Sequence, residues 1–156
     1  AALPEARLYL AGLVSDRLRQ ALAGNARVRL LGVVDHDRAC RLMRGADVLL
    51  YVGKPGQPVG IKLYEYLGSG RPIVVCGPDA GEAAGLVTGA GAGLAVGRVE
   101  DVPAALAQLR AGSFAGSDRS RFDRRQQAGR LAELAERLVV GRPAWSAAAQ
   151  PPGGNP

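Results

Sequence analysis

Aromatic residues, cysteine and histidine are all scarce in this chain of 156 residues. Phe, Trp and Tyr together make up 4% of the sequence, which argues against a base-stacking surface for RNA or single-stranded DNA. With two cysteines and a single histidine, His36, the chain lacks the partners that a zinc site or a nucleophilic triad needs. We therefore expect no nucleic-acid partner, no bound metal and no cofactor.

Long apolar runs and a disulfide framework are also lacking. No apolar stretch approaches the roughly 20 residues that cross a bilayer. Cys40 and Cys76 are interpreted as small buried apolar residues, so a reducing compartment is expected. The opening Ala1-Ala2-Leu3-Pro4 is too abrupt for a targeting segment. Together these features favour a cytoplasmic location.

Lysine is rare as well, although the chain is basic. The formal net charge is +6 and the pI is about 10.0, yet Lys54 and Lys62 are the two lysines and arginine supplies the rest. Basic proteins commonly meet anionic partners, but the sign of the charge alone does not distinguish a sugar nucleotide from an acidic lipid. A solvated basic surface explains the bias equally well.

Short apolar strands alternate with helical segments along most of the chain. Branched and apolar residues in short runs indicate strands, and Ser15, Asp35 or His36, and Asp101 are suitable helix starts. This alternation predicts right-handed crossovers and a parallel sheet covered on both faces, the α/β doubly wound class. We expect strands at 7–12, 28–32, 47–52, 73–76 and 93–96.

The chain is organised around residues 57–76, where a glycine-containing loop leads into a short helix and then a buried strand. Pro58 suits the first helical position, because its missing N–H costs nothing there. The N–H groups of Val59, Gly60 and Ile61 would then be free at the positive end of the helix, where a phosphate can bind. Gly60 has no side chain to keep a ligand away.

Lys62 and Glu65 lie three residues apart in the same predicted helix and therefore share a face. Lys62 can meet phosphate oxygens, and the carboxylate of Glu65 can accept hydrogen bonds from sugar hydroxyls. A simple ion pair on the helix surface is the structural alternative for the same spacing. The pair marks the place in the chain where we expect chemistry.

These residues resemble the donor-site signature of retaining GT-B glycosyltransferases of the group 1, or family 4-like, type. The family pattern is Glu-Gly-Phe-Gly-Leu-Pro, followed by two residues and a second Glu. By this resemblance Glu65 binds the ribose hydroxyls, and Gly60 and Ile61 lie at the backbone that holds the diphosphate. Ser69-Gly70-Arg71-Pro72 matches the end of the signature. Gln57 stands where the family has its first Glu, and it keeps a carbonyl acceptor without the charge.

The resemblance also implies the fold and the activity. Val33-Val34-Asp35-His36 falls where the family places the nucleotide base, so Val34 joins the expected site. The implied fold is a Rossmann-like doubly wound sheet, one half of a GT-B fold. The implied function is to bind a nucleoside diphosphate sugar and transfer its hexose-like group to an acceptor held by an N-terminal domain. The donor-site residues expected are Gln57, Gly60, Ile61, Lys62, Glu65 and Val34.

We expect three segments: a Rossmann-like domain at 1–112 that lacks its N-terminal part, a C-terminal helix at 113–141, and a disordered tail at 142–156. The chain alone would then be inactive. Two further functions remain open. Gln57 favours a catalytically idle module that only binds a sugar nucleotide. The arginine-rich last helix favours a basic module that contacts a protein or an anionic membrane, which would place it at the inner face of that membrane.

Overall fold

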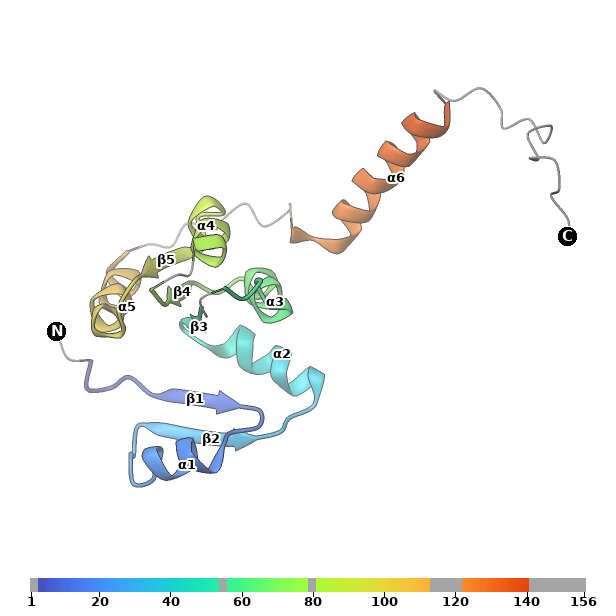
Figure 1. The fold of residues 1–156 in the computed structure, drawn as a ribbon. Coiled ribbons are helices and arrows are strands. Elements are labelled where there is room, and N and C mark those ends of the chain that lie inside the picture. Colours follow the sequence, from blue (N-terminus) through green and yellow to red (C-terminus); the bar gives the residue numbers. More distant parts are fainter. Residues whose placement is uncertain (1–2, 54–55, 79–80, 113–121, 141–156) are drawn as a thin grey trace, which may run out of the picture. The chain divides into compact units, whose positions relative to one another are not determined.

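The computed structural model describes residues 3–53, 56–78, 81–112 and 122–140. The chain divides into two units, residues 1–119 and 120–156, which are described separately below. Strands and helices alternate in the first unit as predicted, and the second unit contains the expected last helix (Figure 1). The elements are β1 (Leu8–Ala11), α1 (Asp16–Leu22), β2 (Val28–Gly32), α2 (His36–Gly45), β3 (Leu49–Val52), α3 (Ile61–Ser69), β4 (Ile73–Cys76), α4 (Gly81–Gly89), β5 (Gly93–Val96), a 3-10 turn at Val99–Asp101, α5 (Val102–Ala111) and α6 (Arg124–Val140).

The three-segment division remains a prediction, and the expected disordered tail at 142–156 lies outside the described residues, as do residues 113–121.

Polar residues at the starts of α1 and α2 explain where these two helices begin. The hydroxyl of Ser15 accepts the Leu18 N–H at 3.3 Å, and the carboxylate of Asp35 accepts the Arg38 N–H at 2.7 Å. These bonds satisfy backbone donors that have no partner inside the helix. The predicted helix starts at Ser15 and Asp35 are therefore confirmed. Asp101 precedes α5 as expected, but its side chain makes no capping hydrogen bond.

The strands are parallel as predicted, but they form two sheets and not one. β1 pairs with β2, whereas β4 lies between β3 and β5 in a second sheet. In the part of the chain that the structure describes, no pairing joins the two sheets. The prediction of a single sheet is therefore wrong, because the crossover from β2 through α2 reaches β3 without bringing it beside β1 or β2.

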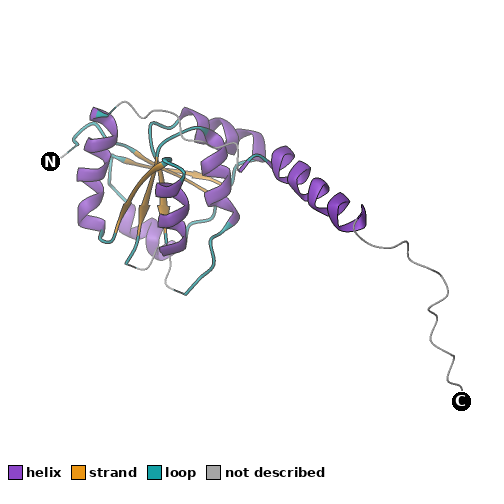
Figure 2. Cartoon of the chain, turned by 90° about the horizontal axis from the view of Figure 1, so that it is seen from above, coloured by secondary structure: helices purple, strands orange, loops and turns teal. Residues whose placement is uncertain are grey.

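The core lies around the second sheet. Ile73, Val74 and Val75 of β4 are completely buried, as are Leu63 and Leu67 of α3. Each such side chain contributes about 1.5–3 kcal/mol by leaving water. Helices α4 and α5 pack against β4 and β5, and Figure 2 shows helices around the strands of the first unit. Helix α3, which carries several of the predicted site residues, is thus anchored in this core through Leu63 and Leu67.

The first sheet is much less covered. Among the described residues of β1 and α1 none is buried, and Tyr9 is 54% exposed. A parallel sheet normally has both faces covered, so β1 and β2 depart from the pattern expected of their class.

Gly93 fixes the distance between β4 and β5. A Cβ atom at this position would overlap the carbonyl oxygen of Ile73, its partner across the ladder. The glycine-rich segment just before Gly93 is a turn, as predicted. Helix α4 ends at Gly89, and Gly91 has a φ of 60°. Only a residue without a side chain lets the two strands approach this closely.

Candidate functional site

The organising stretch follows β3 at the carboxyl edge of the second sheet, the edge where open α/β sheets bind their ligands. β3 ends at Val52, and α3 begins at Ile61 with Gly60 as its N-cap residue. The helix therefore begins three residues later than the sequence predicted, and Pro58 lies outside it. This correction moves the phosphate-binding end of the helix to Gly60 and Ile61.

Gly60 makes a contact that the sequence did not reveal. Its N–H donates to the hydroxyl of Tyr51, nine residues earlier in β3, at 3.2 Å. The prediction that the Gly60 N–H is free is therefore wrong in this structure. The first-turn N–H groups of α3 are those of Ile61 and Lys62, and the helix itself supplies no acceptor for them.

Neither backbone conformation nor packing requires glycine at position 60. Its φ is −74° and its ψ is 155°, which any residue adopts. A Cβ atom there would lie 3.8 Å from the Tyr51 hydroxyl, an ordinary van der Waals distance. The missing side chain leaves open space beside the start of α3, as a ligand approaching the backbone would need.

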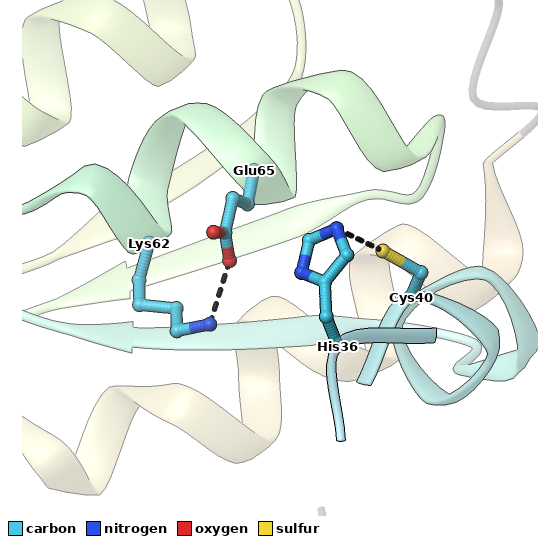
Figure 3. Close-up of polar contacts among 4 residues, drawn as sticks. All are labelled: His36, Cys40, Lys62 and Glu65. Carbon is cyan, nitrogen blue, oxygen red and sulfur yellow. Dashed lines mark hydrogen bonds and ion pairs between the residues drawn. The ribbon is translucent and has the colours of Figure 1, made fainter. Parts of the chain in front are cut away.

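Lys62 and Glu65 are brought together on the first turns of α3. The Nζ atom of Lys62 lies 2.7 Å from Oε2 of Glu65, and their side chains are 60% and 27% exposed (Figure 3). The hydrogen bond to Glu65 raises the pKa of Lys62 above its ordinary value, so the ammonium stays charged at neutral pH. The structural alternative of an ion pair is thus present, and it also places a cation and a carboxylate side by side.

Helix α2 adds two groups to the same neighbourhood. α2 packs against α3, and the pair His36 and Cys40 on α2 is drawn with Lys62 and Glu65 in Figure 3. The Nε2 atom of His36 lies 3.5 Å from Sγ of Cys40, one helical turn away. The described residues contain no group of three or more His, Cys, Asp or Glu that could hold a metal ion.

Arg71 joins the far ends of these two helices. Its Nε atom donates to the carbonyl oxygen of Arg44, in the last turn of α2, at 2.5 Å. Because Arg71 directly follows the turn at the end of α3, this bond connects the end of α3 to the end of α2. The Gly-Arg-Pro turn of the sequence thus provides a contact between the two helices at the ends opposite Gly60 and Asp35.

The remaining predicted residues lie on loops. Val34 is half-buried between β2 and α2, two residues before His36, and Gln57 is exposed between β3 and α3. Among the described residues, no hydrogen bond connects either of them to Lys62 or Glu65, so their membership of the site stays a prediction. Tyr51 was missed because an aromatic residue in a strand usually indicates packing. Its place at the carboxyl end of β3 was the available signal.

The comparisons with known proteins concern the family and the fold. A family model described as "Glycosyl transferases group 1" matches residues 1–111. AviGT4, a glycosyltransferase involved in avilamycin A biosynthesis, is similar in structure with a TM-score of 0.60 and 22% identity, over 87% of this chain and 44% of that one. Sucrose-phosphate synthase from Thermosynechococcus elongatus gives 0.59 and 18%, over 90% of this chain and 40% of that one. No curated protein matches the sequence. The fold is thus a Rossmann-like half of a GT-B fold, and the chain spans less than half the length of these structures.

Proposed function

Because the chain belongs to the group 1 glycosyl transferases, we propose that it is the half of such an enzyme that binds a nucleoside diphosphate sugar, the donor of a hexose-like group. The observation that supports this most strongly is the Lys62–Glu65 pair, which lies just inside a helix whose N-cap is a glycine.

The start of α3 suits a diphosphate. The N–H groups of Ile61 and Lys62 point out of the first turn, where the helix dipole favours negative charge. Gly60 leaves room for phosphate oxygens close to the backbone. The charged Nζ atom of Lys62 adds a strong donor from the same turn, because hydrogen bonds to ionised partners are shorter and stronger than neutral ones.

The carboxylate of Glu65 suits the ribose. Its Oε2 atom is engaged by Lys62, and an ionised carboxylate can accept further hydrogen bonds at both oxygens. A sugar nucleotide would thus meet Lys62 with its phosphates and Glu65 with its ribose hydroxyls. In this arrangement the ion pair holds the two side chains ready for the ligand and need not break.

The acceptor would be bound outside this chain, by an N-terminal domain of the same protein. The solved structures that resemble the chain are more than twice as long as the matched region, which supports two domains. Transfer to an acceptor by the 156 residues alone is therefore not expected. A glycosylated acceptor produced by the purified chain would contradict this division of labour.

Gln57 supports a second candidate, a catalytically idle module that binds the sugar nucleotide without transfer. Its amide provides an acceptor but no negative charge for a developing cationic sugar. We expect Gln57→Glu to change discrimination between sugar nucleotides while leaving affinity for the bare nucleoside diphosphate within about twofold, since Gln57 faces the sugar in this proposal. Titration calorimetry with both ligands measures the two effects separately.

A thermal-stability screen against nucleoside diphosphate sugars tests the donor proposal. A true donor at 100 times its dissociation constant stabilises the folded chain by about 2.7 kcal/mol. Glu65→Gln should then lower affinity for that donor at least about tenfold, or 1.4 kcal/mol, because a charged acceptor of ribose hydroxyls is lost. The thermal stability of the ligand-free Glu65→Gln variant should hardly change, since exposed ion pairs contribute little.

The matched control is Glu100→Gln, which removes the same charge from an exposed ion pair, the one with Arg98. It should leave donor affinity unchanged. Equal affinity of the Glu65→Gln and unmodified chains for every ligand that binds would overturn the donor-site assignment.

A further inference from the structure

The hydroxyl of Tyr51 lies at the start of α3 without belonging to that helix. Tyr51 is part of β3, and its hydroxyl oxygen accepts the N–H of Gly60 at 3.2 Å. The donor-site signature begins later in the chain, at Gln57, so the resemblance gives Tyr51 no role. The bond nevertheless joins the carboxyl end of a strand to the residue that caps the helix.

Gly60 is held through both of its backbone polar groups. Tyr51 accepts from its N–H, and its carbonyl oxygen accepts the N–H of Leu63 at 3.0 Å. In a capping box, a polar side chain at the third helical position bonds the N–H of the N-cap residue. Leu63 has no polar group for this purpose, so Tyr51 replaces it from a neighbouring strand. The bond therefore orients the first turn, where Ile61 and Lys62 present their N–H groups.

The Tyr51 hydroxyl also has a hydrogen of its own to donate. A tyrosine hydroxyl can accept and donate at the same time, and the bond from Gly60 uses it only as an acceptor. Within the part of the chain that the structure describes, this hydroxyl donates no hydrogen bond. Accepting one bond makes it a stronger donor for the next, because hydrogen bonds in a chain polarise one another.

Open space borders this hydroxyl on the side where Gly60 lacks a side chain. A Cβ atom at position 60 would lie 3.8 Å from the hydroxyl oxygen of Tyr51. Leaving aside the two chain neighbours of Gly60, no other described atom comes within 4 Å of that point. An atom placed in this space would therefore meet the Tyr51 hydroxyl and the start of α3 together.

We propose that the hydroxyl of Tyr51 donates a hydrogen bond to a phosphate oxygen of the sugar nucleotide. The hydroxyl accepts from Gly60 and gives its own hydrogen to an oxygen that also receives the first-turn N–H groups of Ile61 and Lys62. The inference rests on the proposed donor-binding function and adds a residue of β3 to the groups on α3. An anion suits this set, because its members all donate hydrogen bonds and the helix dipole is positive here.

A role for Tyr51 as a competitor of the ligand has the opposite sign. If the phosphate took the N–H of Gly60, the Tyr51 hydroxyl would have to leave, and its removal would raise affinity. The structure favours cooperation over competition. The helix supplies no acceptor for the N–H groups of Ile61 and Lys62, so a phosphate can bind there without breaking the bond between Gly60 and Tyr51.

Inorganic pyrophosphate is the probe for a test, because it has the two phosphates of the ligand without a base or a sugar. In an NMR titration of the whole chain, pyrophosphate should shift the amide signals of Ile61 and Lys62. Tyr51→Phe should lower pyrophosphate affinity at least about tenfold, because a hydrogen bond to a charged partner is lost. Tyr9→Phe, the matched control, removes the same hydroxyl from a tyrosine of β1 that is 54% exposed. It should leave the affinity unchanged.

Gly60→Ala separates contact with the ligand from support of the helix. The backbone at Gly60 suits any residue, and the new methyl group would lie at an ordinary van der Waals distance from the hydroxyl, so the bond to Tyr51 should persist. The methyl group fills the space proposed for the phosphate oxygen, and pyrophosphate affinity should fall several-fold. If Tyr51 only supported the helix, Gly60→Ala would bind normally. Thermal unfolding of both variants should hardly change, because the bond is exposed and water can replace it.

The variant with both changes tests whether they act on one contact. The two losses should overlap and not multiply, because each removes the same meeting of hydroxyl and phosphate. Losses that multiply, normal binding by Gly60→Ala, or an affinity of Tyr51→Phe that is unchanged or raised would overturn the role of Tyr51. Each of these results would leave the phosphate site at Ile61 and Lys62 standing. If pyrophosphate shifted neither of these amides in the unmodified chain, the phosphate site itself would be overturned, and the role of Tyr51 with it.

Discussion

Lys62 and Glu65 serve both as a surface ion pair and as two ligand-binding groups, and their geometry reconciles the two roles. An exposed pair contributes little to folding, so the conformation it fixes matters more than its energy. The pair keeps a cation at the phosphate end and a carboxylate one turn deeper along α3. That these two side chains share a helix face was predictable from the sequence, because they lie three residues apart on one helix.

The raised pKa of Lys62 leads to a prediction about pH. A raised pKa in the folded state means that the pair's contribution is complete below the ordinary lysine pKa of about 10.4 and is lost only as the pH rises above it. Lys62→Gln should therefore lower affinity for a nucleoside diphosphate sugar at least about tenfold, and equally at neutral pH and near pH 9. Titration calorimetry at both values measures this.

Arg98→Gln is a suitable control, because it removes one positive charge from an exposed pair with Glu100. It should leave affinity unchanged at both values. A loss in Lys62→Gln that shrinks between neutral pH and about pH 9 would show that another group titrates at the site.

At the scale of elements, helix starts set by neighbouring side chains were predictable and the start of α3 was not. Ser15 and Asp35 cap their helices through residues three positions on, so the sequence alone contains the interaction. Pro58 satisfied the local rule for a first helical position. The actual start at Ile61 coincides with a bond from Gly60 to Tyr51, a contact with another element that no local pattern contains.

The β4–β5 pair gives a test at this scale. Gly93→Ala places a Cβ atom against the Ile73 carbonyl, so the ladder must shift and stability should fall by about 1–3 kcal/mol. Gly85→Ala, in the middle of α4, is the matched control, because nothing lies within 4 Å of its Cβ position. It should stabilise the chain by up to about 1 kcal/mol through helix propensity. Urea unfolding of both variants decides, and equal midpoints would contradict the close approach of the two strands.

At the scale of the whole molecule, the sequence contained the order of the elements and the parallel class, but not the pairing. Each strand is marked by its own apolar run, whereas pairing joins distant residues, such as Leu8 with Val28 and Leu49 with Ile73. The division into two sheets depends on which strand edges form hydrogen bonds with each other, β1 with β2 and β4 with β3 and β5. Among the donor-site residues, Lys62 and Glu65 come together locally, but the approach of α2 to α3 depends on long-range contacts such as Arg71 with Arg44.

The open edge of β3 gives the last prediction. The N–H groups of Leu49 and Gly53 donate to Pro72 and Cys76 on the β4 side, so those of the alternate residues Leu50 and Val52 point to the edge where the described chain provides no strand. Unbonded amides exchange fast even within a strand. Amide hydrogen exchange measured by NMR should therefore alternate along β3, with Leu50 and Val52 fast and Tyr51 slow.

β4 provides the internal control for that measurement. It has a partner on each side, so its neighbouring amides at Val74 and Val75 should both exchange slowly. Uniform protection along β3, equal to that of β4, would mean that a strand covers the open edge in solution. Because an exposed strand edge invites pairing, self-association through this edge would produce the same uniform pattern, and dilution would then restore the alternation.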